Sequence, residues 1–160
     1  MTTDAEKYTV RSVERAFTIL EALKDNGEMR LIDVSRSTMI NKGMAFKLLY
    51  TLCSKGYVEH DGETGKYRLG KTLFELGHAA GNQITERRGA HDILRSLVEK
   101  INETAHLAVL QGSDVLYLDK VESNASLRMV TAVGIRRPAY CTGTGKALLA
   151  GLTDDEVRRL

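Results

Sequence analysis

The chain has 160 residues, 42% of them hydrophobic and 28% charged, a composition typical of a folded globular protein and unlike that of a disordered chain. This length accommodates one domain, or a small module followed by part of a second domain. No run approaches the roughly 18 apolar residues of a transmembrane helix, and the polar N-terminus lacks the apolar segment of an export signal. We therefore expect a cytoplasmic protein without a membrane partner.

The net charge of +2 is too small by itself to indicate nucleic-acid binding, but the charge is unevenly distributed. Between Arg30 and Lys55, five basic residues stand against a single acid, Asp33. Such an excess is found both on ordinary solvated helices and on nucleic-acid interfaces. Cys53 and Cys141 lie far apart without the CxxC spacing of a zinc site, and the four histidines share no metal-ligand spacing. We expect no metal and no cofactor.

Two helices are expected in the first 40 residues. Ser12 stands just before a run of apolar residues at helical spacing and Gly27 soon after it, which predicts a first helix that begins just after Ser12. Its expected core positions are Val13, Ala16, Phe17, Leu20 and Leu23. A second, shorter helix is expected from about Leu31 to Ser37, with Leu31 and Val34 facing the same core.

The segment from Asn41 to Ser54 predicts a third helix with two different faces. One narrow apolar stripe holds Ala45, Leu48, Leu49 and Leu52. The opposite face holds Gly43, Lys47, Tyr50 and Ser54, with Lys42, Met44, Phe46 and Thr51 along its margins. Two short helices, a tight turn and a helix with a basic outer face are typical of a helix-turn-helix, whose second helix enters the major groove of DNA. Lys42 and Lys47 are the expected groove and phosphate contacts.

A β-hairpin is expected after Gly56, where the period changes from helix to strand. Residues 57–60 and 66–69 are rich in strand-forming side chains, and residues 61–65 supply the turn. Next to the recognition helix, such a hairpin is a wing, and Lys66 and Arg68 would contact the DNA backbone without reading its sequence. A winged helix can also serve protein contacts or dimerisation; the basic excess on the recognition segment favours DNA.

Two blocks of residues, in a fixed order, carry a specific resemblance. The first consists of Val10 to Ala16, Lys47-Leu48-Leu49, Leu52, Gly56-Tyr57-Val58, Tyr67 to Gly70 and Leu76-Gly77. The second consists of Leu107 to Leu110, Val115 to Glu122, Leu127-Arg128, Val133-Gly134, Arg137-Pro138 and Thr142 to Ala147. From about Val10 onward the chain resembles the isocitrate-lyase-regulator (IclR) family of transcription regulators.

The resemblance implies a DNA-binding transcription regulator, more often a repressor, and not an enzyme. Its expected partners are a double-stranded DNA operator, a small-molecule effector and a second copy of the chain, in a homodimer or a dimer of dimers. The expected DNA contacts are Arg11, Ser12, Lys42, Gly43, Met44, Phe46, Lys47, Thr51, Lys66 and Arg68.

The start of the recognition helix departs from the family pattern. Where the family usually has proline-lysine-serine-threonine, this chain has Asn41, Lys42, Gly43 and Met44, so two hydroxyl contacts are missing. Lys47 replaces the usual arginine, and a lysine acts as a point charge where an arginine grips guanine with two hydrogen bonds. We therefore expect the operator sequence to differ from the family norm.

The rest of the chain predicts a linker helix and an α+β domain. Helices are expected from Lys71 to about Asn82 and over residues 89–104, and strands over 106–111, 115–121 and near 127–133. The expected boundaries are 8–70 for the winged helix-turn-helix, 71–87 for the linker and 88–160 for the second domain. The resemblance implies a GAF-like effector-binding fold, truncated because family chains continue past residue 160.

Glycines at Gly143-Thr144-Gly145-Lys146 open an expected helix over residues 147–152, and such a corner suits a small carboxylate. The spacing excludes a nucleotide-binding P-loop, because Tyr140 and Ala147 occupy required positions. The resemblance implies an effector pocket lined by Met129, Cys141, Gly143 and Thr144. Alternatively, the glycines only make a helix entry turn.

Two other functions stay open on the residues alone. In one, the chain is a small-molecule sensor or enzyme whose N-terminal module mediates protein contacts only. In the other, the chain represses constitutively without a ligand.

Overall fold

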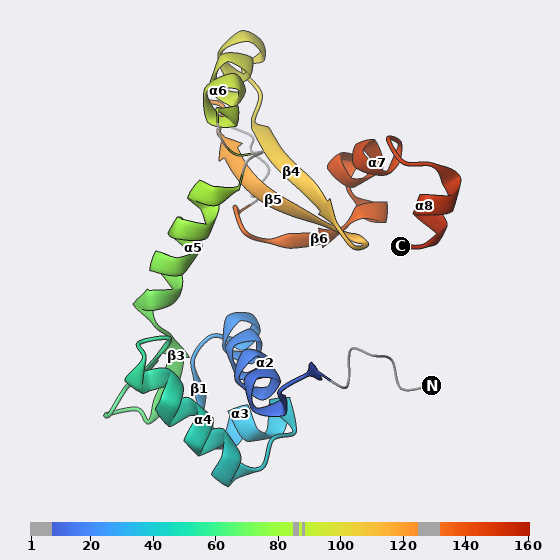
Figure 1. The fold of residues 1–160 in the computed structure, drawn as a ribbon. Coiled ribbons are helices and arrows are strands. Elements are labelled where there is room, and N and C mark those ends of the chain that lie inside the picture. Colours follow the sequence, from blue (N-terminus) through green and yellow to red (C-terminus); the bar gives the residue numbers. More distant parts are fainter. Residues whose placement is uncertain (1–7, 85–86, 88, 125–131) are drawn as a thin grey trace. The chain divides into compact units, whose positions relative to one another are not determined.

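The computed structural model describes residues 8–84, 87, 89–124 and 132–160 (Figure 1). The chain divides into two compact units, Met1–Ala79 and Ala80–Leu160. Both contain helices and a three-stranded sheet, so the predicted α+β class is confirmed. The expected linker, residues 71–87, corresponds largely to helix α5, Lys71–Gln83, and the division between the units falls within that helix.

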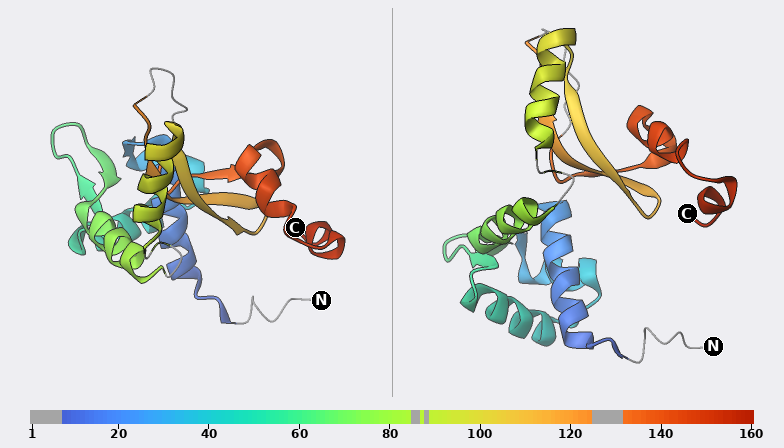
Figure 2. Two further views of the ribbon diagram at one scale, coloured as in Figure 1. Left: turned by 90° about the horizontal axis from the view of Figure 1, so that it is seen from above. Right: turned by 45° about the horizontal axis from the view of Figure 1, so that its top comes forward.

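In the described part of the first unit, the helices α2 (Arg11–Asn26), α3 (Leu31–Thr38) and α4 (Lys42–Ser54) precede the start of α5 and accompany a small antiparallel sheet (Figures 1 and 2). Its strands are β1 (Met29–Arg30), β2 (Val58–His60) and β3 (Lys66–Leu69), in the order β1-β3-β2. The hairpin β2–β3 is the expected wing, whereas β1, too short for a periodic pattern, was not predicted.

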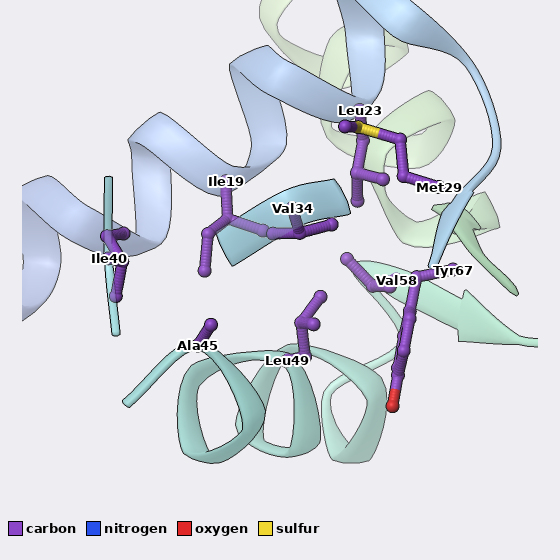
Figure 3. Close-up of a cluster of buried hydrophobic side chains, with 9 residues drawn as sticks. All are labelled: Ile19, Leu23, Met29, Val34, Ile40, Ala45, Leu49, Val58 and Tyr67. Carbon is purple, nitrogen blue, oxygen red and sulfur yellow. The ribbon is translucent and has the colours of Figure 1, made fainter. Parts of the chain in front are cut away.

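One apolar cluster holds the first unit together (Figure 3). Ile19 of α2, Val34 of α3 and Leu49 of α4 are fully buried and point toward one another. The complete buried cluster is Ile19, Leu23, Met29, Val34, Ile40, Ala45, Leu49, Val58 and Tyr67. Because Val58 and Tyr67 come from the hairpin, the same core fixes the wing to the three helices.

The predicted start and core face of the first helix were partly wrong. The helix begins at Arg11 with Val10 in the capping position, so Ser12 lies inside the first turn and caps nothing. Val13 and Phe17 are 50% and 59% exposed, and the helix buries Ile19 instead. Two neighbouring apolar strips run along this helix, and its packing partners select the strip that contains Ile19 and Leu23.

The second unit contains a meander of three antiparallel strands (Figures 1 and 2). Its strands are β4 (Ala105–Gln111), β5 (Asp114–Val121) and β6 (Arg136–Pro138), in the order β4-β5-β6. Helix α6 (Ala90–Ile101) precedes the sheet, and the short helices η2 (Ala139–Cys141), α7 (Gly143–Leu149) and α8 (Asp154–Arg158) follow it. The first two predicted strands are thus confirmed.

The two faces of this sheet pack against different helices. Ala105 and Leu107 join Leu94 and Val98 of α6 in one apolar cluster. Ala108 and Leu110, which alternate with them along β4, belong to a second cluster. The second cluster is centred on Val115, Tyr117 and Ala139 and includes Leu148 and Leu149 of α7. Helix α6 therefore covers one face, and η2 with α7 packs against the other.

Two helices of this unit have other bounds than predicted, and most of the expected third strand is not among the described residues. Helix α6 ends at Ile101, before the predicted Thr104, because Asn102 adopts a left-handed conformation that ends the helix. Helix α7 spans residues 143–149 and not 147–152, because Thr142 caps it. Residues 127–131 of the expected third strand lie outside the described residues, and the third strand of the described sheet is β6.

Within the described ranges, every helix is too short or too polar to cross a lipid bilayer.

Candidate nucleic-acid interface

The turn that leads into α4 is tightly fixed. Met39 ends α3 in a left-handed conformation, with φ of 54°. The Ser35 hydroxyl donates to the carbonyl oxygen of the buried Ile40 at 2.6 Å. Asn41 then caps α4, since its Oδ1 accepts a hydrogen bond from the backbone N–H of Met44 at 2.9 Å. These contacts set the direction in which the first turn of α4 leaves the core.

The predicted division of α4 into two faces is confirmed. Ala45 and Leu49 are fully buried, while Leu48 and Leu52 pack partly buried against the same core. The exposed side of the helix, which we call the outer face, consists of Lys42, Gly43, Phe46, Lys47, Tyr50, Thr51 and Ser54. Because α4 contains no acidic residue, this face carries two positive charges that no carboxylate on the helix opposes.

Two of the predicted contact residues on α4 have other roles as well. Met44 is half-buried and packs against the core, so less of its side chain is available to a partner. The Thr51 hydroxyl donates to the carbonyl oxygen of Lys47 at 2.9 Å, one turn earlier in the same helix. Arg11 and Ser12, expected to contact DNA as well, are exposed in the first turn of α2.

The wing owes its shape to a carboxylate in its turn. Asp61 Oδ1 accepts hydrogen bonds from the backbone N–H groups of Glu63 and Thr64, at 2.8 and 3.1 Å. The hydrogen bonds from the Thr64 and Glu63 backbone lower the pKa of the Asp61 carboxyl below its ordinary value. Gly65, with φ of 68°, completes the turn in a conformation that favours glycine.

Arg68 was expected to contact the DNA backbone, but its guanidinium is held by two carboxylates. Its Nε and Nη2 donate to Glu59 Oε2 at 3.0 and 2.9 Å, and Nη1 donates to Glu28 Oε1 at 3.4 Å. These hydrogen bonds, first to Glu59 and then to Glu28, raise the pKa of Arg68. The pairing ties β3 to β2 and to the segment between α2 and β1. The spacing of residues in the sequence did not indicate this role. Lys66, the other predicted wing contact, is half-buried.

In the second unit, Cys141, Gly143 and Thr144 lie together where η2 meets α7. Cys141 is exposed and its thiol donates to the carbonyl oxygen of Pro138 at 3.4 Å. Thr142 caps α7 by accepting the backbone N–H of Gly145 at 3.0 Å. Met129, the fourth predicted effector residue, lies outside the described residues.

The two glycines of this corner serve different purposes. A side chain at Gly145 would collide with the backbone carbonyl oxygen of Ala139, so this glycine permits the close packing of α7 on η2. A side chain at Gly143 would meet nothing within 4 Å. The helix-entry explanation therefore accounts for Gly145, whereas open space adjoins Gly143.

Sequence patterns did not single out His106, which lies on β4 and alternates with Leu107. Its Nε2 is buried and has no hydrogen-bond partner within the described part of the chain, and its ring lies edge-on to Tyr117 with centroids 5.5 Å apart. Burial, and after it the charge of Lys120, lowers the pKa of His106, which favours a neutral ring. Among the described residues, no group of three or more His, Cys, Asp or Glu side chains is arranged to hold a metal ion.

A capped helix with a cationic outer face, a wing and a separate α+β unit define the class of helix-turn-helix regulators that carry a second domain. Residues 12–62 match the IclR helix-turn-helix domain, and residues 80–160 match the C-terminal domain of the bacterial transcriptional regulator IclR. The chain belongs to the IclR family of bacterial transcriptional regulators.

Individual relatives agree with this assignment. The transcriptional regulator KdgR of Escherichia coli is 36% identical over 157 residues, covering 98% of this chain and 60% of KdgR. The transcriptional repressor IclR of Escherichia coli is 30% identical over 154 residues, covering 94% of this chain and 56% of that protein. The chain thus spans between half and two thirds of the length of these relatives.

Solved structures of similar regulators have the same fold as this chain. A regulator from Alicyclobacillus acidocaldarius matches with a TM-score of 0.79 and 26% identity, over 95% of this chain and 62% of the other. A regulator from Rhodococcus sp. RHA1 matches with a TM-score of 0.77 and 30% identity, over 94% and 59%. The family resemblance seen in the sequence is confirmed, and the sensor-or-enzyme alternative is not favoured.

Proposed function

We propose that the protein is a dimeric transcription regulator that binds operator DNA through the outer face of α4 and changes its affinity when a small carboxylate occupies the second unit. The observation that carries this proposal is the outer face itself. Lys42 and Lys47 project from a helix whose opposite side is locked in the core by Ala45 and Leu49. An α-helix fits the major groove of DNA, and lysine side chains that all project from one side of it can reach phosphates and base edges there.

The proposed DNA contacts are mainly exposed residues. On α4 they are Lys42, Gly43, Phe46, Lys47 and Thr51, and outside it they are Arg11 and Ser12. Lys66 of the wing, which is half-buried, is retained as a backbone contact. We assign Arg68 to the internal structure of the wing because Glu59 and Glu28 already occupy its donors. We assign Met44 mainly to the core.

The proposed effector site is the corner where η2 meets α7, with Cys141, Gly143 and Thr144 facing the ligand and Met129 completing the set. The space beside Gly143 and the backbone N–H groups at the start of α7 support a carboxylate there. Repression is the direction we propose, since the relatives include a transcriptional repressor. A dimer would present two α4 helices to two operator half-sites about one helical turn apart.

The proposal is tested by selecting bound duplexes from random DNA, with and without a pool of small carboxylates. We expect enrichment of a sequence with two related half-sites, and a change in retention when carboxylates are present. Recovery of unrelated duplexes only would contradict operator recognition and favour a module for protein contacts. An enriched operator whose retention no carboxylate changes would contradict the effector half of the proposal and favour constitutive repression.

A further inference from the structure

Two aromatic rings lie exposed on the outer face of α4, where the fold does not need them. Phe46 is 50% exposed and Tyr50 is 69% exposed. Their ring centroids are 6.4 Å apart with planes inclined by 37°, the contact expected one helical turn apart. Together with Lys47 and Thr51 they line a shallow, mainly apolar depression of about 330 Å³.

The position of Phe46 makes its ring accessible from the N-terminal end of the helix. Side chains on a helix tilt toward its N-terminus, so the side chain of Phe46 leans toward the first turn of α4. Gly43 has no side chain, and a Cβ placed there would have only Asn41 Oδ1 within 4 Å, at 3.7 Å. The N-terminal part of a recognition helix is the part that contacts base edges.

We propose that Phe46 packs against the C5-methyl group of a thymine in the major groove and thereby selects thymine at one position of each half-site. This inference rests on the proposed DNA-binding function. The thymine methyl is the apolar group that the base edges present in the major groove, and phenylalanine is among the side chains that contact it. Tyr50 is a positioning residue, since its ring packs against that of Phe46 and limits where Phe46 can move.

Charge decides between DNA and a protein as the partner of this apolar surface. Lys47 lies beside the two rings, Lys42 lies one turn away, and α4 contains no acid. A duplex offers phosphates to the lysines and methyl groups to the rings at the same time.

The test replaces each thymine of the selected operator, one at a time, by deoxyuracil, which removes only the methyl group. For the unchanged protein we expect one position in each half-site at which this replacement weakens binding about fourfold, the value for one buried methyl-sized group. For Phe46→Ala we expect weaker binding and equal affinity for thymine and uracil at that position. Phe46→Leu, which keeps an apolar side chain, should retain part of the preference.

Two further variants separate the methyl contact from other effects. Lys47→Ala should weaken binding to both duplexes and leave the thymine-to-uracil ratio unchanged. Tyr50→Ala should reduce that ratio, and Tyr50→Phe should restore it, since the ring and not the hydroxyl holds Phe46.

The outcomes distinguish this inference from the proposed function. If no duplex is retained, the regulator proposal fails, and the thymine contact fails with it. If an operator is bound but every thymine tolerates uracil, or if Phe46→Ala keeps the preference, only the thymine contact is overturned. Unchanged operator affinity of Phe46→Ala would also overturn it, and would assign the aromatic surface to a protein partner.

Discussion

Lys47 shows how a single residue connects the fold to its function. It lies on the exposed outer face because Leu48 and Leu49, its neighbours in sequence, turn toward the core. We predict that Lys47→Ala weakens operator binding and makes the slope of log affinity against log salt shallower by about 0.9, the change for one lost phosphate contact. Titrations at several salt concentrations measure both effects.

A control for this prediction comes from the other unit. Lys100 is an exposed residue of α6, so Lys100→Ala makes the same change in net charge away from the outer face. We expect this variant to keep the slope of the unchanged protein. Equal slopes for the two variants would mean that Lys47 acts through net charge alone and does not contact a phosphate.

The two glycines at the start of α7 should differ in how substitution by alanine changes the stability of the protein. Gly145→Ala should lower the free energy of unfolding by about 1–3 kcal/mol, because the added methyl collides with the Ala139 backbone and forces α7 away from η2. Gly143→Ala has open space and should leave stability unchanged or slightly higher. Denaturant unfolding measures both; a loss of stability in Gly143→Ala would show that this corner is closed to an effector.

At the scale of an element, the wing depends on the ionised form of Asp61. Its pKa is lowered in the folded hairpin because the carboxylate accepts the backbone N–H groups of Thr64 and Glu63. The stabilisation that it supplies is therefore fully present above the ordinary aspartate pKa of about 3.9 and is lost as the pH falls through the lower, folded value. We predict that the amide resonances of Glu63 and Thr64 titrate together, with a midpoint below that of a free aspartate.

Asp61→Asn provides the matched control for this titration. The amide oxygen still accepts hydrogen bonds but carries no titrating charge, so the hairpin should persist and its pH dependence in this range should disappear. A midpoint at the ordinary aspartate value in the unchanged protein would contradict the hydrogen bonds of the turn.

The elements differ in how well the sequence predicted them. Helix α4 was predicted together with its two faces, because Ala45 and Leu49 repeat at helical spacing and Asn41 is a strong capping residue. In α2 the choice between two neighbouring apolar strips depends on which one meets α3 and α4, and this tertiary information is absent from local spacing. Val13 and Phe17 were misplaced for that reason.

In the candidate site, too, features that depend on neighbouring residues were predicted, and contacts between residues distant in the sequence were not. Exposure of Lys47 follows from the period of its own helix and was predicted. The engagement of Arg68 joins residues that are nine and forty positions apart in the chain, so only the folded hairpin shows it. His106 was missed because an isolated histidine in a strand carries no periodic signal, and its lack of a partner depends on what packs around it.

At the scale of the whole molecule, each apolar core lies within one unit. The cluster around Ile19 and Leu49 belongs to Met1–Ala79, and the clusters around Leu94 and Val115 belong to Ala80–Leu160. A helix, α5, connects the units in sequence. Damage to one core should therefore destabilise its own unit first.

Leu49→Ala tests this independence. The substitution removes a fully buried side chain from the centre of the first core and should lower the free energy of unfolding of that unit by about 2–5 kcal/mol. Hydrogen exchange should accelerate for the amides of α2 and α4, while protection of β4 and β5 stays as in the unchanged chain. Val115→Ala, at the centre of a core in the other unit, should give the reverse pattern. Equal acceleration in both units from either variant would mean that the two cores unfold as one.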